Sequence, residues 1–212
     1  MTLTQLPSIV TVSTERPEVG GPDHPMRRVT FDTAFEPDSW TPERATKVAE
    51  LFDSLAPTWK ERDGPERHAS LLDALDRGGP FPAGVCIEVG AGAGVATPVL
   101  REALRGVIAL DLSFEMLALA SSDAPRVLAD SSVLPIRSRS VAVVALVNMF
   151  LFPAEVDRVL DPDGVLLWVS TLGDATPIYL EPSDVLRALP GDWRGMTADA
   201  GWGTWLVARR VR

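Results

Sequence analysis

Residues 86–94, with the sequence CIEVGAGAG, place an apolar run directly before three glycines at alternate positions. Glycine has no side chain and accepts left-handed backbone angles, so a turn of this kind lets a ligand approach the backbone closely. In open α/β sheets, the turn between the first strand and its helix contributes to a ligand site at the carboxyl ends of the strands. We therefore predict an α/β fold whose ligand site includes residues 88–94.

Beyond this turn, short apolar runs alternate with helical patterns. Continuous runs rich in valine and leucine are typical of strands covered on both faces, and their alternation with helices predicts parallel pairing through right-handed crossovers. The last two runs lie too close together for a crossover helix, so we expect them to form an antiparallel hairpin at one edge. The sequence predicts a doubly wound, mostly parallel sheet of seven strands, at 85–89, 107–111, 126–130, 141–150, 164–170, 193–199 and 203–210.

The chain before the glycine-rich turn divides into two parts. Residues 1–40 carry frequent prolines and the pair Gly20-Gly21, so we predict an extended N-terminal arm. Within it, residues 26–35 have apolar side chains only partly at strand spacing, which permits a short edge strand. Residues 41–80 predict a helical cap, with amphipathic helices over 41–56 and 65–77. Residues 81–212 then form the ligand-binding core.

Charge and cysteine content narrow the classes of function. The net charge of −9 repels polyphosphate and anionic headgroups, which argues against nucleic-acid and membrane-surface partners. The single cysteine, Cys86, lies in an apolar run and is interpreted as a buried thiol in a reducing compartment. We find no apolar stretch of membrane-spanning length and no export signal, so we expect a cytoplasmic protein.

Three carboxylates follow or lie within successive predicted strands. The glycines read Gly90-x-Gly92-x-Gly94, which is the wrong register for a dinucleotide pyrophosphate, and Glu88 beside them suits a ligand with an amine or sulfonium. At the tip of the next strand, Asp111 is suited to accept hydrogen bonds from ribose hydroxyls, and Asp130 ends the strand after it. This pattern indicates a phosphate-free nucleoside that carries positive charge.

These motifs together resemble the class I S-adenosylmethionine-dependent methyltransferases, particularly their compact small-molecule branch. EVGAGAG resembles the first motif of the family, ALD its ribose-binding acidic position, and LADSSVLPIRSRSVAVV the segment that runs past adenine into the fourth strand. DRVLDPDGVLLWVS and GWGTWLVARR resemble the fifth strand with its preceding turn and the terminal strand. The resemblance covers roughly residues 45–210 and implies a Rossmann-like fold, with the N-terminal cap over the cofactor site.

The resemblance also implies roles for individual residues. The methionyl portion of S-adenosylmethionine would lie against Glu88 and the turn formed by Gly90, Ala91, Gly92 and Gly94. Asp111 would bind the ribose, Leu112 would pack on the adenine face, and Asp130 with Ser131 would bind the adenine edge. Trp59 would shield the sulfonium or line the acceptor site, with helix packing as the alternative. The resemblance implies no metal.

Candidate catalytic residues are few, because methyl transfer needs alignment, desolvation and, for some acceptors, removal of a proton. Asn148, at the tip of the fourth predicted strand, is the leading candidate near the transferred methyl group, with capping of the following loop as the alternative. His68 is a candidate base that could deprotonate an acceptor, and the alternative is a surface or helix-packing role. His24 lies in the proline-rich arm, where we do not expect a catalytic role. Asp174 and Tyr179 follow the fifth strand, where they could reach an acceptor.

The sequence therefore predicts an enzyme that transfers a methyl group from S-adenosylmethionine to a small-molecule acceptor, with a homodimer left open. The alternatives are a methyltransferase-like binding module without turnover and a protein methyltransferase. A nicotinamide oxidoreductase ranks last, because of the register of the glycines.

Overall fold

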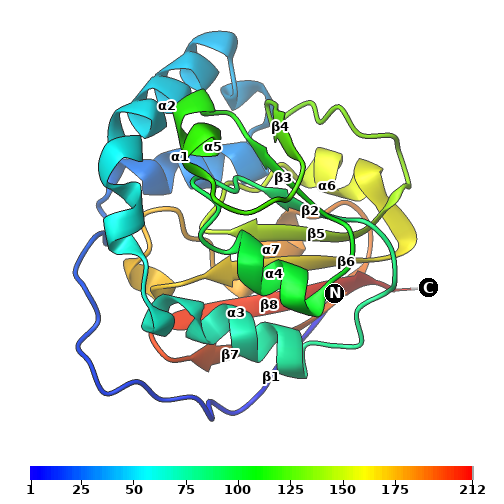
Figure 1. The fold of residues 1–212 in the computed structure, drawn as a ribbon. Helices are drawn as coiled ribbons and strands as arrows, with labels where there is room; N and C mark the ends of the chain where they lie inside the picture. The colour runs from blue at the N-terminus through cyan, green and yellow to red at the C-terminus, as the bar shows by residue number, and fades with distance from the viewer. Residues whose placement is uncertain (212) are drawn as a thin grey trace.

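The computed structural model describes residues 1–211 and contains a mixed sheet with helices on both faces (Figure 1). Within these residues the sheet has eight strands in the order β1-β7-β8-β6-β5-β2-β3-β4. Their bounds are β1 Thr2–Gln5, β2 Cys86–Val89, β3 Val107–Asp111, β4 Arg126–Leu128, β5 Val141–Val147, β6 Leu160–Ser170, β7 Trp193–Ala200 and β8 Gly203–Arg210.

Strand β2 lies where the order of the strands reverses. It pairs in parallel with β3 on one side and with β5 on the other, so that Cys86 is aligned with both Val107 and Val143. Strand β8 runs antiparallel between β6 and β7. The mostly parallel sheet and the antiparallel C-terminal hairpin are confirmed, and the reversal at β2 fixes where a ligand site forms in such a fold.

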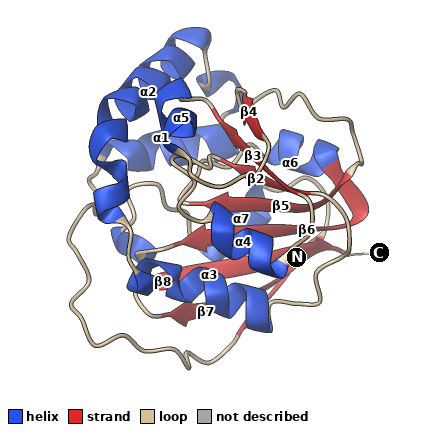
Figure 2. Cartoon of the chain, in the orientation of Figure 1, coloured by secondary structure: helices blue, strands red, loops and turns tan. Residues whose placement is uncertain are grey.

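The helices form two layers around the sheet (Figure 2). On one face, α3 and α4 bury Leu71, Ala74 and Leu100 against the strands, while the other face carries α1, α6 and α7. No helix within residues 1–211 combines the length and apolar character needed to cross a bilayer. The α-helices are α1 Pro25–Phe35, α2 Pro42–Leu55, α3 Pro65–Arg77, α4 Thr97–Ala103, α5 Phe114–Leu119, α6 Pro153–Val159 and α7 Pro182–Ala188, with 3₁₀ turns η1 Pro37–Ser39, η2 Ala56–Arg62 and η3 Gly173–Ala175.

The predicted helices at 41–56 and 65–77 are found as α2 and α3. Helix α2 begins because the Thr41 hydroxyl accepts a hydrogen bond from the Arg44 backbone N–H at 3.2 Å and Pro42 occupies the first helical position. A cap of this kind contributes about 1 kcal/mol. Helix α3 also starts at a proline, Pro65, without a side-chain cap from Gly64, and it closes at Gly78, whose N–H donates to the Ala74 carbonyl at 2.8 Å.

Two expectations about the N-terminal residues are wrong. Residues 25–35 form helix α1 rather than an edge strand, because Thr30, Thr33 and Ala34 are buried against neighbouring elements that the local pattern does not reveal. Residues 2–5, expected to belong to the extended arm and not to the sheet, form β1, which pairs in parallel with β7. The sheet therefore has one strand more than predicted, and the β7–β8 hairpin does not lie at its edge.

Between β1 and α1 the chain follows the ends of the C-terminal strands. The Gly201 N–H donates to the Val10 carbonyl at 3.0 Å, and Trp202 Nε1 donates to the Thr14 carbonyl at 2.9 Å. Arg16 then donates to the Leu172 carbonyl and pairs with Asp174. This strap, residues 6–24, leads into α1 and the cap, and all of these segments lie at the end of the sheet where the parallel strands finish (Figure 1).

Candidate active site

A cavity of about 430 Å³ lies at the carboxyl ends of β2, β3, β5 and β6, which is within the range of small-molecule sites. We call its strand-side wall the floor and the opposite wall, from the start of α1 to the start of α3 (residues 25–68), the cap. The cap side is mostly apolar and includes Trp40, Val48, Phe52, Leu55 and Trp59. The predicted site residues that line the cavity are Trp59, His68, Glu88, Gly90, Ala91, Gly92, Asp111, Leu112, Ser131 and Asn148.

The glycine-rich turn connects β2 to α4 through left-handed backbone conformations. Gly90 and Gly92 have φ angles of +74° and +54°, which side-chain-bearing residues rarely adopt. The N–H groups of Gly90 and Ala91 both donate to the Leu110 carbonyl, at 2.8 and 2.9 Å. Gly94 also has a positive φ but does not line the cavity: a Cβ there would lie 3.1 Å from Ala120 Cβ, so its role is close packing against the end of α5.

Asp111 is oriented by the backbone around it. Its Oδ2 accepts from the Gly92 N–H at 2.7 Å and its Oδ1 from the Ser113 N–H at 2.8 Å. Burial raises the pKa of Asp111, an effect that the backbone hydrogen bonds oppose and the charge of Asp53 reinforces. The carboxylate is therefore held in one direction at the cavity wall, with accepting capacity left on both oxygens.

Glu88 is a buried carboxyl, with an exposed fraction of 2%. Burial raises its pKa to about 8, the negative Asp111 adds to the rise, and a 2.6 Å hydrogen bond from the Thr97 hydroxyl opposes it. The group is therefore mainly protonated at neutral pH. A cationic ligand beside it would favour the ionised form, because an opposite charge in a low-dielectric site lowers a carboxyl pKa.

The predicted adenine-binding pair is split by the structure. Ser131 lines the cavity, but Asp130 does not. Both carboxylate oxygens of Asp130 lie 3.1 Å from Trp40 Nε1, and Oδ1 also accepts from the Ser132 N–H. Trp40 in turn packs against Phe150 and lines the cavity, so Asp130 anchors a cap side chain. No sequence motif singles out Trp40, which the sequence analysis missed.

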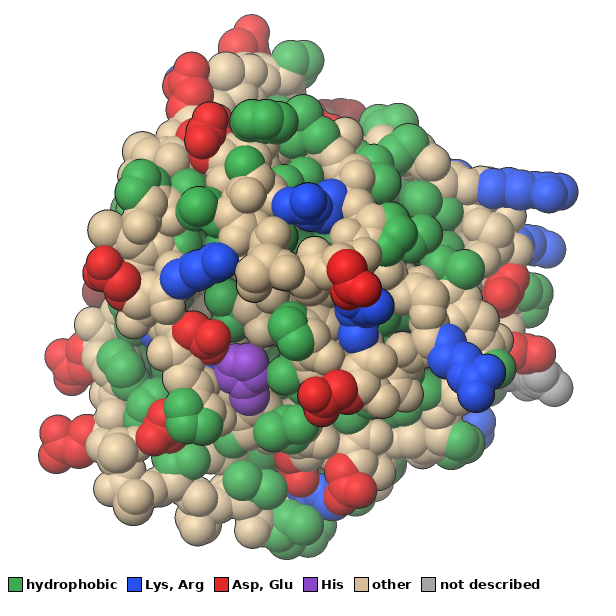
Figure 3. Space-filling model, in the orientation of Figure 1, with side chains coloured by type: hydrophobic (Ala, Val, Ile, Leu, Met, Phe, Trp, Pro, Cys, Tyr) green, Lys and Arg blue, Asp and Glu red, His purple; other side chains and the backbone are tan. Residues whose placement is uncertain are grey.

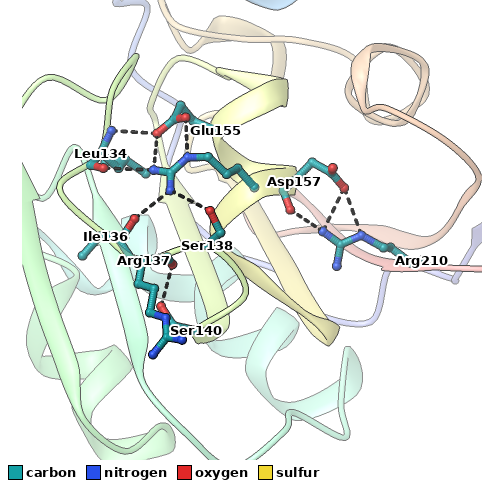
Figure 4. A network of polar contacts seen from close by, with 9 residues as sticks. Leu134, Ile136, Arg137, Ser138, Ser140, Glu155, Asp157 and Arg210 are labelled. Atoms are coloured by element: carbon teal, nitrogen blue, oxygen red, sulfur yellow. Dashed lines mark hydrogen bonds and ion pairs between the residues drawn. The ribbon is translucent and has the colours of Figure 1, made fainter.

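The loop that carries Ser131 is fixed by a polar network from α6 (Figure 4). Glu155 accepts from the Leu134 N–H at 2.7 Å and from Arg158, which also donates to the carbonyls of Leu134 and Ile136. Burial alone would raise the pKa of Glu155, but the bonds from Arg158 and Leu134 outweigh it and the pKa is lowered. The network gives the segment between β4 and β5 a fixed path beside the cavity.

Asn148 joins the ends of two strands. Its φ is +51°, its Nδ2 donates to the Thr171 hydroxyl at 2.9 Å, and its Oδ1 accepts from the Thr171 N–H at 2.8 Å. Both ends of the amide are therefore engaged with the chain that follows β6. Asn148 lines the cavity, and its bonds to Thr171 are of the kind that a loop-capping role requires.

His68 lies in the cap wall together with an acidic partner. His68 Nε2 is 2.7 Å from Asp63 Oδ1, and the same oxygen accepts from the Gly64 N–H. Both residues line the cavity, and Asp63, like Trp40, was not recognised from the sequence. Trp59 also lines the cavity, while it packs edge-on against Phe52 with ring centroids 5.7 Å apart.

Other sequence candidates lie elsewhere. Tyr179 and Asp174 line a separate polar cavity with Arg16 and Glu181, so the expectation that they reach the acceptor is wrong for this structure. His24 does line the main cavity, but its Nδ1 accepts from the Met26 N–H and caps α1. Cys86 is a buried thiol whose pKa is raised by burial.

Comparisons with known proteins agree with this arrangement. Residues 87–168 match the family described as "Methyltransferase domain". No curated protein sequence matches the chain. Among solved structures, a SAM-dependent methyltransferase from Aquifex aeolicus is similar, with a TM-score of 0.60 and 18% identity over 74% of this chain and 98% of that one.

Two further solved structures share the fold. A SAM-dependent methyltransferase from Thermotoga maritima has a TM-score of 0.59 and 13% identity, over 77% of this chain and 99% of that one. The complex of DhpI with SAH (S-adenosylhomocysteine) has a TM-score of 0.62 and 17% identity, over 78% and 96% of the two chains. The sheet order and the similar solved structures lead to one conclusion: the chain has the α/β fold of these S-adenosylmethionine-dependent methyltransferases, and residues 87–168 match a methyltransferase family within it.

Proposed function

We propose that this methyltransferase acts on a small-molecule acceptor that binds under the cap. The observation that carries the proposal is a cavity of about 430 Å³ whose floor holds most of the predicted cofactor-binding residues and whose opposite wall is mostly apolar. An acceptor bound between them would be surrounded by Trp40, Phe52 and Trp59 rather than by an open groove. Such a space favours a small, partly apolar molecule over a polypeptide.

The floor residues fit the cofactor on the chemistry they present. Gly92 leaves the backbone open, since a Cβ there would meet no atom closer than Trp59 Nε1 at 3.5 Å, whereas Gly90 makes room for the Met149 side chain beside the turn. Asp111 offers oriented carboxylate oxygens for ribose hydroxyls, Leu112 an apolar surface for adenine, and Ser131 a polar group for its edge. Glu88 and the turn would hold the methionyl portion, with Ala91 contributing backbone.

S-adenosylmethionine supplies an activated methyl group on a sulfonium, which an acceptor lone pair displaces as the carbon–sulfur bond breaks. The chain contributes alignment and exclusion of water, which are sufficient for much of the acceleration in such displacements. Trp59 and Phe52 exclude water from the cap side. Asn148, tied to Thr171, would keep the ends of β5 and β6 at a fixed separation beside the reacting atoms.

We also propose that His68 accepts a proton from the acceptor when the acceptor carries one. Its 2.7 Å contact with Asp63 orients the ring and would stabilise the imidazolium that forms, and both side chains line the cavity. This arrangement supports acceptors with a dissociable proton, such as hydroxyl or protonated amine groups.

A polymeric nucleic acid is a poor acceptor on electrostatic grounds. The net charge is −9, and on the face in Figure 3 the Lys and Arg side chains are scattered among acidic ones rather than gathered into a stripe. A homodimer and a cytoplasmic location stay predictions from the sequence.

The proposal is tested by calorimetric titration with S-adenosylmethionine, S-adenosylhomocysteine and NAD, followed by measurement of S-adenosylhomocysteine formation. We expect micromolar binding of the first two ligands, none of NAD, and turnover with members of a panel of phenols, amines and thiols. Turnover with polypeptides alone would contradict the small-molecule acceptor. Cofactor binding without turnover on any acceptor would favour a binding module instead.

The role of His68 is tested with His68→Gln and Asp63→Asn in the same turnover assay. We expect the rate of His68→Gln to fall and to lose the acidic limb of its pH dependence, with affinity for S-adenosylhomocysteine retained. An unchanged pH profile would contradict the role as base.

A further inference from the structure

Arg67 is one of the partly buried arginines of the molecule. It occupies the first turn of α3 and lines the cavity. Burial lowers its pKa, the neighbouring Arg62 lowers it further, and Asp63 acts in the opposite direction. The guanidinium is thus partly removed from water beside a second positive charge.

No hydrogen bond or ion pair within residues 1–211 satisfies the Arg67 guanidinium. Asp63 is the carboxylate whose negative charge acts on Arg67. Its Oδ1 already accepts from the Gly64 N–H and lies 2.7 Å from His68 Nε2. Elsewhere in the described chain, partly buried arginines either pair with carboxylates, as in Arg77 with Asp73 and Arg158 with Glu155, or donate to backbone carbonyls, as Arg27 and Arg209 do. A desolvated cation without a counter-charge is unfavourable, so this exception requires a reason.

Arg62 adds to the same positive corner. It lines the cavity and stacks over the Trp59 ring, with its guanidinium carbon 4.8 Å from the ring centroid. Trp59 in turn faces the glycine-rich turn, because a Cβ at Gly92 would lie 3.5 Å from Trp59 Nε1. The arginine corner, Arg62 and Arg67, is therefore connected to the end of the cavity where the turn approaches the ligand.

We propose that the arginine corner binds a carboxylate inside the cavity, with Arg67 as the main contact. This proposal rests on the proposed use of the cavity by cofactor and acceptor. A guanidinium presents paired N–H groups that match a carboxylate, and the interaction strengthens where water is excluded. The carboxylate has two sources, the methionyl tail of the cofactor and an acidic acceptor, and the contact of Trp59 with the turn favours the first.

The test compares two ligands that differ in the amino-acid tail. S-adenosylhomocysteine carries the carboxylate, whereas 5′-methylthioadenosine has the same nucleoside thioether without it. In calorimetric titrations we expect Arg67→Met to weaken S-adenosylhomocysteine binding by roughly tenfold to a hundredfold and to leave 5′-methylthioadenosine binding unchanged. Arg67→Lys, which keeps the charge but loses the paired donors, should give an intermediate loss.

The matched control is Arg105→Met, which removes an exposed arginine from the turn before β3, at the opposite end of the strand from the cavity. It should bind both ligands as the unsubstituted protein does. Melting temperatures of all variants establish that they are folded.

A second arm distinguishes the sources of the carboxylate. If Arg67→Met binds S-adenosylhomocysteine normally, benzoate and benzyl alcohol are titrated into the protein saturated with S-adenosylhomocysteine. Benzoate binding that depends on Arg67, with no such dependence for benzyl alcohol, assigns the corner to the acceptor. No effect of Arg67→Met on either S-adenosylhomocysteine or benzoate overturns the proposal. Failure of the unsubstituted protein to bind S-adenosylhomocysteine would instead count against the proposed function.

Discussion

The floor and the cap of the cavity are held together by different forces. On the floor, the polar groups are fixed by directional bonds over short distances, as in Glu88 with Thr97, Asp111 with Gly92, and Asn148 with Thr171. The cap is held mainly by apolar contacts, in clusters around Val48, Phe150 and Ile178 and around Ala56, Ala93 and Met116. Hydrogen bonds fix the direction of a group, whereas apolar contacts tolerate repacking.

The difference suggests a division of labour. The floor must present the same donors and acceptors to the same cofactor in every catalytic cycle, and directional bonds keep them in place. Under the proposed function the cap would match the acceptor, and apolar side chains can be exchanged there without leaving buried polar groups unpaired. If this division holds, substitutions on the floor should affect cofactor affinity far more than substitutions that loosen the cap.

The largest effect is expected for Gly92→Val. Its backbone has a φ of +54° and lines the cavity, so a branched side chain there would occupy the space of the cofactor. We expect binding of S-adenosylhomocysteine to be abolished, as measured by calorimetry.

Gly94 offers a matched comparison, because its φ of +73° imposes similar strain while its Cβ position faces Ala120 rather than the cavity. Gly94→Val should lower the melting temperature more than Gly92→Val does. If the two variants lost equal stability and Gly92→Val still bound S-adenosylhomocysteine, Gly92 would not face the ligand.

The next largest effect is expected for Asp111→Ala. Two charge-assisted hydrogen bonds to ribose should contribute roughly 3 kcal/mol together, so affinity for S-adenosylhomocysteine should fall about a hundredfold. Calorimetry on the folded variant measures this loss directly. An unchanged affinity would show that the ribose binds elsewhere.

Asp53→Ala is the control from the cap side. Asp53, on α2, accepts hydrogen bonds from the Ser113 hydroxyl and the Glu115 N–H, and so links the cap to the floor without lining the cavity. Its removal should change cofactor affinity by only a few fold. A loss as large as that of Asp111→Ala would erase the distinction between floor and cap.

The smallest effect is a dependence of stability on pH that arises from Glu88. Its pKa rises from an ordinary value of 4.5 in the unfolded chain to about 8 in the folded one. Between these values the folded state holds a proton that the unfolded state has lost, so this contribution to stability is fully present below the ordinary pKa and is lost as pH rises through about 8. We expect the free energy of unfolding, measured with denaturant, to decrease by roughly a few kcal/mol between pH 5 and about 8 because of this group.

Glu88→Gln removes the titrating proton while keeping the size of the side chain. Its stability should fall less than that of the unsubstituted protein between pH 5 and about 8. S-adenosylmethionine is a cation and should favour ionised Glu88. Its presence should therefore bring the pH profiles of the two proteins closer together. Parallel pH profiles for the two proteins would contradict a raised pKa at this position.

Sequence and structure agree best on the floor. The glycine-rich turn, Glu88 and Asp111 could be predicted because each lies at a fixed offset from a continuous apolar strand, and parallel strands bring their carboxyl ends to one edge. Helix α2 could be predicted from its capping threonine and apolar stripe.

The cap could be predicted only in part, because its contacts are formed between distant segments. Residues 25–35 are helical through burial against other elements, and β1 depends on the edge that β7 offers, neither of which local periodicity encodes. Asp130 was expected to face adenine since it ends a strand-like run, but β4 ends at Leu128 and Trp40 takes the carboxylate. Asp63 and Arg67 carry no motif and are recognised only by their place at the cavity.

Strand β1 gives the cap a second covalent attachment to the sheet. The cap is joined to β2 through α3 on one side, and through the strap of residues 6–24 to β1, which is paired with β7, on the other. A segment tethered at both ends has a high effective concentration over the surface it covers, so weak individual contacts suffice to keep it there. The edge strand β1 thus helps to hold the cap over the cavity through its covalent connection to the cap, without contacting the cavity itself.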